Sequence, residues 1–260
     1  MKIATWNVNS IKARTEHVAR YLEEEAPDIL CLQELKCIDD AFPRERYEDL
    51  GYQVETHGQK TYNGVALLSK LPLEDITHGL LGDESDEQAR YIEAVVSVDG
   101  GVVRVASIYL PNGNPAPGPK YDYKLGWMKR LQARAEELLA FEEPLVLAGD
   151  YNVIQSADDC YDVKQWKEDA LFLPDTRAAF QSFANLGFTD AVRNTHAVPH
   201  LYTFWDYQRG AWQKDHGIRI DHLMLSPQAA DRLQSCGIDK HTRGWERPSD
   251  HVPVWIELDF

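Results

Sequence analysis

The chain has few cysteines, and they form no pattern that would bind zinc. Cys31, Cys37, Cys160 and Cys236 are scattered, without a Cys-x-x-Cys pair or a histidine cluster at zinc spacing. This distribution favours reduced thiols in a cytosolic compartment over a disulfide framework. Cys31 lies within an apolar run, where we expect it to fill space in the core.

Long apolar runs are also missing. No stretch of about 18 apolar residues occurs, so the sequence predicts no membrane span. Residues 1–7 lack the apolar core and the cleavage site of a secretory signal. No Ser/Gly-rich linker or break in composition divides the chain, and we expect one domain over residues 1–260. At 43% hydrophobic residues, the chain can fill the core of a globular protein.

Positive charge is scarce. Lys and Arg number 27 against 42 Asp and Glu, which gives a formal net charge of −15. A protein that binds nucleic acid through bulk electrostatics would be basic. Either the substrate is not a polyanion, or a local basic face exists on an acidic protein. Acidic runs such as 23–25 and 83–87 are expected to lie on the solvated surface.

Apolar periodicity predicts strands that alternate with helices, which is typical of an α/β protein. The expected helices cover residues 15–25, 123–141 and 176–186. The expected strands cover 2–8, 29–35, 52–56, 64–69, 92–98, 102–110, 145–149, 202–205, 218–225, 237–241 and 252–258. A Gly-Gly turn predicts a hairpin at 99–101, and the proline-rich segment 112–119 is expected to be irregular.

Acidic and amide side chains follow several of the expected strands. Gln33-Glu34 ends one apolar run, Gly149-Asp150 ends another, and Ser249-Asp250-His251 precedes the last. Burying a carboxylate is costly unless a cation or a hydrogen-bond donor compensates it. Several such carboxylates in one chain therefore indicate a divalent metal and a site that handles phosphate.

Spacing and residue type suggest chemistry for two of these groups. Asp150 and Asn152 point to one side of a strand exit, where the acid can take a proton from water and the amide can donate to phosphate. Asp-x-Asn is also a common turn. An Asp beside His251 would keep its imidazole cationic, although a lone His is more often a satisfied core or surface residue.

The motifs together resemble those of the exonuclease III family, within the endonuclease/exonuclease/phosphatase superfamily. They occur in the family's order at 27–36, 149–152, 217–221 and 249–251, with further landmarks at 62–69 and 172–174, and the resemblance spans residues 7–254. The resemblance implies a four-layered α/β sandwich of two packed mixed sheets flanked by helices. It also implies dependence on Mg²⁺, with Mn²⁺ as a substitute, and hydrolysis of phosphodiesters in DNA.

The resemblance also implies roles for individual residues. Glu34 would be the principal metal ligand, Asp150 the general base or the group that orients water, and Asn152 the stabiliser of the transition state. Asp221 would orient His251 against the scissile phosphate, and Tyr109 would offer its hydroxyl to the phosphate or the leaving oxygen. The metal site is expected to draw on Asn7, Glu34, Asp150, Asn152, Asp250 and His251. Strand-end carboxylates facing water, a turn-capping Asn7 and a packed Tyr109 are the structural alternatives.

Substrate contacts are expected from loops. Residues 202–205 and Trp212 resemble an aromatic wall that receives a flipped sugar without its base, although one of Phe204 and Trp205 is expected to be core. The predicted substrate contacts are Asn112, Phe204, Trp205, Trp212 and Arg219. A local basic track is expected from Lys120, Lys124, Lys164, Lys167, Arg209, Lys214 and Arg219.

The sequence thus predicts a cytoplasmic, monomeric nuclease that acts on double-stranded DNA at abasic sites or 3′ ends. Departures from the family pattern at Leu35, residues 190–193 and Asp215 leave open whether abasic incision, 3′-to-5′ exonuclease or 3′-end cleaning dominates. One alternative is a superfamily phosphatase acting on lipid or inositol phosphates, which would suit an acidic protein. The other is a non-catalytic DNA-binding module, which would predict loss of the acidic set that this chain retains.

Overall fold

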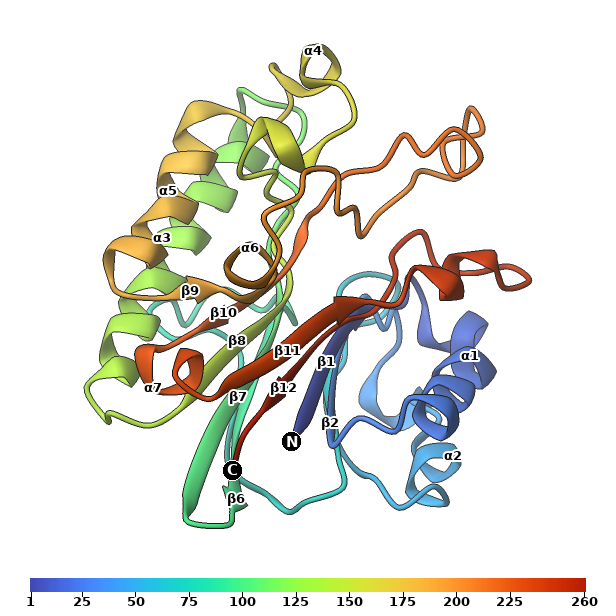
Figure 1. The fold of residues 1–260 in the computed structure, drawn as a ribbon, viewed down its shortest axis with the longest axis vertical. Helices are drawn as coiled ribbons and strands as arrows, with labels where there is room; N and C mark the ends of the chain where they lie inside the picture. The colour runs from blue at the N-terminus through green and yellow to red at the C-terminus, as the bar shows by residue number, and fades with distance from the viewer.

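Two six-stranded sheets form the centre of the computed structural model, which describes residues 1–260 (Figure 1). The first sheet has the order β11-β12-β1-β2-β4-β3, and the second has the order β5-β6-β7-β8-β10-β9. The first sheet comprises β1 (Lys2–Asn7), β2 (Ile29–Gln33), β3 (Gln53–His57), β4 (Val65–Ser69), β11 (Leu233–Ile238) and β12 (Val254–Leu258). The second comprises β5 (Leu73–His78), β6 (Tyr91–Val98), β7 (Gly101–Tyr109), β8 (Leu145–Asp150), β9 (Thr189–Asp190) and β10 (Asp221–Leu225).

Helices cover the outer faces of both sheets. The helices are α1 (Ile11–Glu24), α2 (Arg44–Glu48), α3 (Pro119–Leu139), α4 (Val163–Trp166), α5 (Pro174–Asn185), α6 (Ala191–Thr195) and α7 (Pro227–Ala230), with 3-10 turns at Asp39–Ala41, Ala157–Asp159 and Lys240–Gly244. In Figure 1, α1 and α2 lie outside the first sheet, and α3 and α5 lie outside the second. The predicted four-layered α/β sandwich is therefore confirmed. None of the helices combines the length and the apolar composition that a membrane crossing requires.

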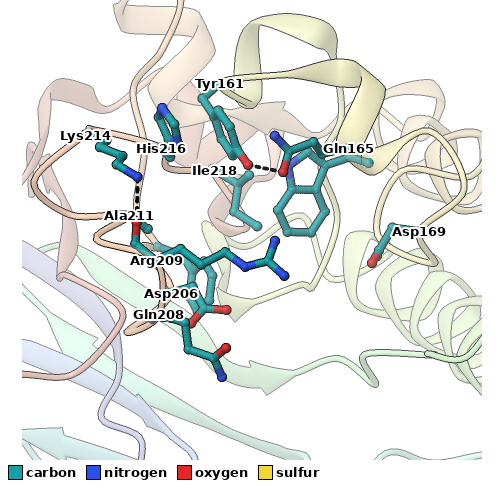
Figure 2. Close-up of a pocket in the computed structure, with 12 residues that line it drawn as sticks. Tyr161, Gln165, Asp169, Asp206, Gln208, Arg209, Ala211, Lys214, His216 and Ile218 are labelled. Carbon is teal, nitrogen blue, oxygen red and sulfur yellow. Dashed lines mark hydrogen bonds between the residues drawn. The ribbon is translucent and has the colours of Figure 1, made fainter.

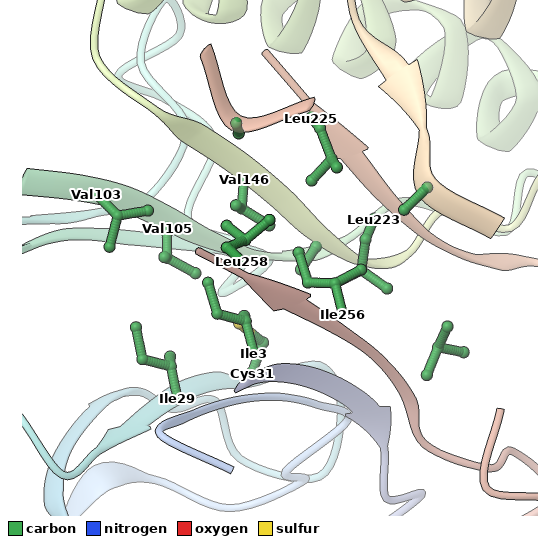
Figure 3. Close-up of a cluster of buried hydrophobic side chains, with 14 of the residues drawn as sticks. Ile3, Ile29, Cys31, Val103, Val105, Val146, Leu223, Leu225, Ile256 and Leu258 are labelled. Carbon is green, nitrogen blue, oxygen red and sulfur yellow. The ribbon is translucent and has the colours of Figure 1, made fainter. Parts of the chain in front are cut away.

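Three apolar clusters hold the layers together. The central one has 21 buried residues from both sheets, among them Ile3 and Cys31 on one side and Val105 and Leu223 on the other (Figure 3). The other two fill the spaces beneath α1 and beneath α3 and α5. Each fully buried aliphatic side chain contributes about 1.5–3 kcal/mol relative to an exposed one. All four cysteines are buried and free, and Cys31 fills the core as expected.

The register of the central strands brings their polar ends together. In the first sheet, β1 and β2 are parallel and pair Asn7 with Gln33. In the second, β7 and β8 are parallel and pair Tyr109 with Asp150, while β10 runs antiparallel and pairs Asp221 with Asp150. Because β1 also contacts β8 across the sandwich, the residues that end these strands meet at one end of the molecule.

Some expected elements differ from the structure. Residues 202–205 are not a strand, because Phe204 makes only single bridges, to Ile218 and to His251, and no ladder extends them. The strand expected from 218 begins at Asp221, and the helix expected from 15 begins at Ile11. Sequence patterns missed β5, because this edge strand is mostly exposed and lacks apolar alternation.

Candidate active site

Asn7, the last residue of β1, joins the two sheets at the site. Its side-chain amide donates to Glu34 Oε1 at 2.9 Å and to Asp150 Oδ2 at 2.9 Å. Asn7 Oδ1 accepts a hydrogen bond from the backbone N–H of Asn9. Both amide hydrogens of Asn7 thereby hold carboxylates of the site, and its oxygen keeps one lone pair beyond the hydrogen bond from Asn9.

A pocket of about 220 Å³ opens at this end of the strands. Seven residues that the sequence predicted for the site line it, and they are Glu34, Tyr109, Asn112, Asp150, Asn152, Asp250 and His251. Phe204 lines it as well. Residues from both sheets and from the C-terminal segment therefore share one cavity.

The donors fit a hard divalent cation. Ligand atoms of Glu34, Asp150 and His251 lie within 4.8 Å of one another. Burial, together with the Asp221 charge, raises the pKa of Asp150 to about 7, against the opposing effect of His251. A buried carboxylate whose pKa stays raised despite its hydrogen-bond donors is a group that a cation would stabilise, and carboxylate oxygens are the ligands that Mg²⁺ prefers. Glu34 and Asp150 therefore fit a metal of this class.

The pKa of Glu34, the first residue after β2, depends on its burial and on the nearby Lys36. Burial alone would raise the pKa of Glu34, but the Lys36 ammonium, 2.9 Å from Oε2, together with the Asn7 hydrogen bond and the His251 charge holds the pKa below its usual value. Lys36 also donates to Asn9 Oδ1, and Asn9 Nδ2 donates to Asp250 Oδ1 at 3.0 Å. No motif in the sequence marked Asn9 for the site, although it lies two residues after Asn7.

His251 lies between two carboxylates that favour its cationic form. Its Nδ1 lies 2.9 Å from Asp221 Oδ2, and its Nε2 lies 3.7 Å from Asp150 Oδ2. Burial opposes protonation, but Asp221 and Asp150 raise the pKa of His251 to about 10. In this protonated form the imidazolium offers Nε2–H to a phosphate oxygen, whereas a neutral imidazole would offer Nε2 to a metal beside Glu34 and Asp150. Ser249 positions the segment by donating to Asn7 O at 2.7 Å.

Asn152 and Asn112 form a hydrogen-bonded pair at the pocket wall. The Asn152 side chain donates to Leu110 O at 2.9 Å and accepts from Asn112 Nδ2 at 3.1 Å. The backbone N–H of Asn152 donates to Asp150 Oδ1 at 2.9 Å. One amide hydrogen of Asn152 remains for a ligand, and its oxygen is engaged, so Asn152 suits donation to phosphate better than metal ligation.

Tyr109 ends β7 with its ring against the pocket. Burial and the nearby charges of Glu34 and Asp150 raise the pKa of Tyr109 well above its ordinary value. The guanidinium of Arg90 lies 4.8 Å from the ring centroid. The phenol therefore stays protonated and can act only as a neutral donor or acceptor toward a bound phosphate.

Lys124, expected on a basic track, is buried beneath the pocket. Its Nζ donates to Asn152 O at 2.6 Å and to Asn112 O at 3.1 Å. Burial lowers the pKa of Lys124 to about 7. The side chain therefore ties together the two loops that carry the Asn pair. Its place on α3 gave no signal of this, because a Lys in an amphipathic helix ordinarily faces solvent.

Arg219 is also buried and does not line the pocket. It is fully buried, with Nε 2.7 Å from Asp159 Oδ1 and Nη1 2.7 Å from Asp190 Oδ2. The expected substrate contact and its share in a basic track are therefore corrected, because both of its charge partners are internal carboxylates. Arg193 joins the same cluster through Asp159.

The two tryptophans of the expected aromatic wall do not line the pocket. Trp205 is fully buried, its indole N–H donates to Asp215 Oδ1 at 3.0 Å, and Trp212 packs against it edge-on with centroids 5.0 Å apart. Phe204 differs, because it lines the pocket with its ring centroid 5.0 Å from that of His251. Neighbouring side chains in an extended segment point to opposite sides, which explains why Phe204 faces the site and Trp205 faces the core.

Several pocket residues had no signal in the sequence. Asn114 donates to Asp169 Oδ1 at 3.0 Å and accepts from the backbone of Ala170. Trp166, on the short α4, lines the pocket beside them. These residues come from the irregular segments around 112–119 and 151–170, where no periodicity indicates which side chains point inward.

Comparison with known proteins gives the family. The model of the endonuclease/exonuclease/phosphatase family matches residues 4–251. The chain belongs to this family. The membership predicted from the motifs is thereby confirmed.

Similar proteins match the chain along its whole length. Exodeoxyribonuclease III of Haemophilus influenzae is 34% identical over 99% of this chain and 100% of its own. The structure of the 3′-5′ exonuclease NExo of Neisseria meningitidis is 40% identical and covers 100% of both chains with a TM-score of 0.95, and a Neisseria NExo 3′ phosphatase bound to a product DNA hairpin gives the same values. An AP endonuclease of Archaeoglobus fulgidus is 36% identical, with a TM-score of 0.94 over 100% of both chains.

Proposed function

We propose that this protein is a Mg²⁺-dependent phosphodiesterase of the exonuclease III type that hydrolyses DNA at abasic sites or 3′ ends. The observation that carries the proposal is the buried series Asp221–His251–Asp150 beside Glu34 in one pocket. A cation held by two carboxylates next to a hydrogen-bonding array suits a phosphate ester more than an uncharged substrate. The full-length likeness to exodeoxyribonuclease III and to NExo supports DNA as the polymer.

Glu34 and Asp150 would hold the metal, with Asp250 beside them at the pocket wall. When bound, Mg²⁺ supplies Lewis-acid stabilisation of the phosphate and of the leaving 3′-oxygen, and Mn²⁺ would substitute. Asn7 would keep the two carboxylates in register through its paired hydrogen bonds. These carboxylates belong to the six-residue ligand set expected from the sequence, and His251 lies beside them in the same group.

The protein's own groups would surround the scissile phosphate. Asp150 orients the attacking water and accepts its proton. His251, fixed by Asp221 at 2.9 Å, donates its Nε2–H to a phosphate oxygen as negative charge develops there. The free amide hydrogen of Asn152 and the phenol of Tyr109 donate to the remaining oxygens. No covalent intermediate is required, because water attacks in line.

An acidic protein would still present cations to DNA. Lys120, Lys164 and Lys167 are exposed and suit the expected basic track, whereas Arg209 and Lys214 line a second pocket that adjoins the first. Lys124 and Arg219 are buried, so they do not belong to the expected basic track. We propose that the protein acts as a monomer in the cytoplasm and that residues 1–260 work as one domain, as the core shared by both sheets suggests.

One experiment tests the proposal against its rival. End-labelled duplexes carrying an abasic site, a 3′-phosphate or a recessed 3′ end are incubated with Mg²⁺ or with EDTA, and inositol phosphates are assayed in parallel. We expect cleavage of at least one DNA substrate with Mg²⁺ and none with EDTA. Hydrolysis of inositol phosphates with all three DNA substrates intact would establish the phosphatase alternative instead.

A further inference from the structure

A second pocket, which we call the neighbouring pocket, adjoins the catalytic one. It has a volume of about 460 Å³. The two pockets share the walls formed by Trp166, Asp169, Phe204, Asp206 and Ile218. Figure 2 shows its other side chains, which come from the loop 206–216 and from the segment around α4. A ligand in the catalytic pocket can therefore continue into the neighbouring pocket without leaving the protein.

The neighbouring pocket offers flat surfaces and hydrogen-bonding edges. Tyr161 and His216 stack with ring centroids 4.4 Å apart and planes 3° from parallel. The amides of Gln165 and Gln208 lie in its wall, as Figure 2 shows. The indole N–H of Trp166, at the shared boundary, is buried and has no hydrogen-bond partner. Aromatic faces combined with amide groups are the features that bind nucleobases.

The charges in this pocket favour a neutral ligand. Arg209 and Lys214 are balanced by Asp169 and Asp206. Lys214 Nζ already donates to Arg209 O at 3.0 Å. A second phosphate would meet two carboxylates here, whereas a neutral base would meet no net charge. The polyanionic backbone of DNA is therefore a poorer occupant than a base.

We infer that the neighbouring pocket is a nucleobase subsite, which receives the base of the 3′-terminal nucleotide whose phosphodiester is cleaved. The inference rests on the proposed function. The catalytic pocket, at about 220 Å³, is smaller than the roughly 300–1,000 Å³ of sites that hold a whole small ligand. It accommodates the phosphate and the sugar, and the base passes the Phe204 boundary into the neighbouring pocket. The subsite makes a base-bearing 3′ end a substrate of this chain.

The test compares two duplex ends that differ only in the base. One recessed 3′ end carries a normal terminal nucleotide, and the other carries a terminal tetrahydrofuran residue, which has the same phosphodiester and no base. The variant Arg209→Ala/His216→Ala changes two exposed side chains of the neighbouring pocket. We expect kcat/KM for the normal end to fall about tenfold, the scale of a lost base contact, while kcat/KM for the baseless end changes less than about twofold.

Arg247→Ala is the matched control, because Arg247 is also exposed and also has a positive φ, 50° against 56° for Arg209, but lines neither pocket. It should leave the ratio of the two kcat/KM values unchanged. Ala211→Leu adds volume at the wall of the neighbouring pocket. It should lower the ratio of kcat/KM for the normal end to kcat/KM for the baseless end, as the double variant does. An equal loss on both ends, or no loss on either, would overturn the subsite. A wild-type protein that incised an abasic duplex but cleaved neither end would also overturn the subsite, whereas one that cleaved none of these DNA substrates would refute the proposed function.

Discussion

The pairing of Asp221 with His251 gives the sharpest test of the proposed site. Asp221→Asn keeps the size of the side chain and an acceptor for Nδ1–H, but it removes the buried charge 2.9 Å from the imidazole. Hydrogen bonds to a charged partner contribute about 1.5–3 kcal/mol. If that contribution is made in the transition state, kcat falls about 10- to 150-fold at 1.36 kcal/mol per tenfold.

The assay is steady-state cleavage of a labelled duplex at saturating Mg²⁺, with the melting temperature measured on the same preparations. Asp190→Asn is the control, because Asp190 is also a buried carboxylate in the second sheet, but its partner is Arg219 outside the pocket. We expect Asp190→Asn to lower stability with little change in kcat, and Asp221→Asn to lower kcat. Full turnover by Asp221→Asn, or an equal loss of kcat in both variants, would refute the role given to His251.

Three further outcomes follow from the geometry. Added Mg²⁺ should raise the melting temperature of the wild type but not of Glu34→Gln, and equal shifts would place the metal elsewhere. Lys124→Met removes the hydrogen bonds to the main chain of Asn112 and Asn152, so kcat should fall about tenfold or more. An unchanged kcat would show that these loops keep their positions without Lys124. Asp159 and Asp190 are buried, which opposes ionisation, yet Arg219 holds the pKa of each below its ordinary value. The contribution of these two carboxylates to folding stability is thus present above the unfolded pKa of about 3.9 and is lost as pH falls through the folded values. The difference in urea midpoint between wild type and Asp190→Asn should therefore shrink from pH 7 to pH 3. A constant difference would contradict this.

The sequence predicted the convergence of the site because strand ends are visible in it. Apolar runs end at Asn7, Gln33 and Asp150, and the register of β1 with β2 and of β7 with β8 brings those ends together. A carboxylate that follows a run of buried aliphatic residues is expected at the end of its strand. When two such sheets pack face to face, few arrangements other than a shared site remain for these strand-end carboxylates. The family motifs added the order of the boxes, and hence Asp221 and His251.

The sequence could not predict which cations and aromatics point inward. Arg219 and Lys124 resemble surface cations until Asp159, or the main chain of Asn152, is known to lie against them. Trp205 and Phe204 are adjacent and chemically similar, and only the backbone direction decides that one of them faces the pocket. These outcomes depend on tertiary contacts between distant segments, which local periodicity does not encode.

The double sheet provides rigid positions for the concentrated charge of the site. Three carboxylates lie close together at the site, those of Glu34, Asp150 and Asp221. The cations beside them are His251 and Lys36. Like charges in a buried pocket oppose folding, so the arrangement persists only if the surrounding structure cannot relax. Central strands fixed by hydrogen bonds on both sides and packed on both faces meet that requirement, whereas loops alone would not. Mg²⁺ binding would relieve the same repulsion, which ties the stability of this end of the sandwich to the metal that the proposed reaction needs.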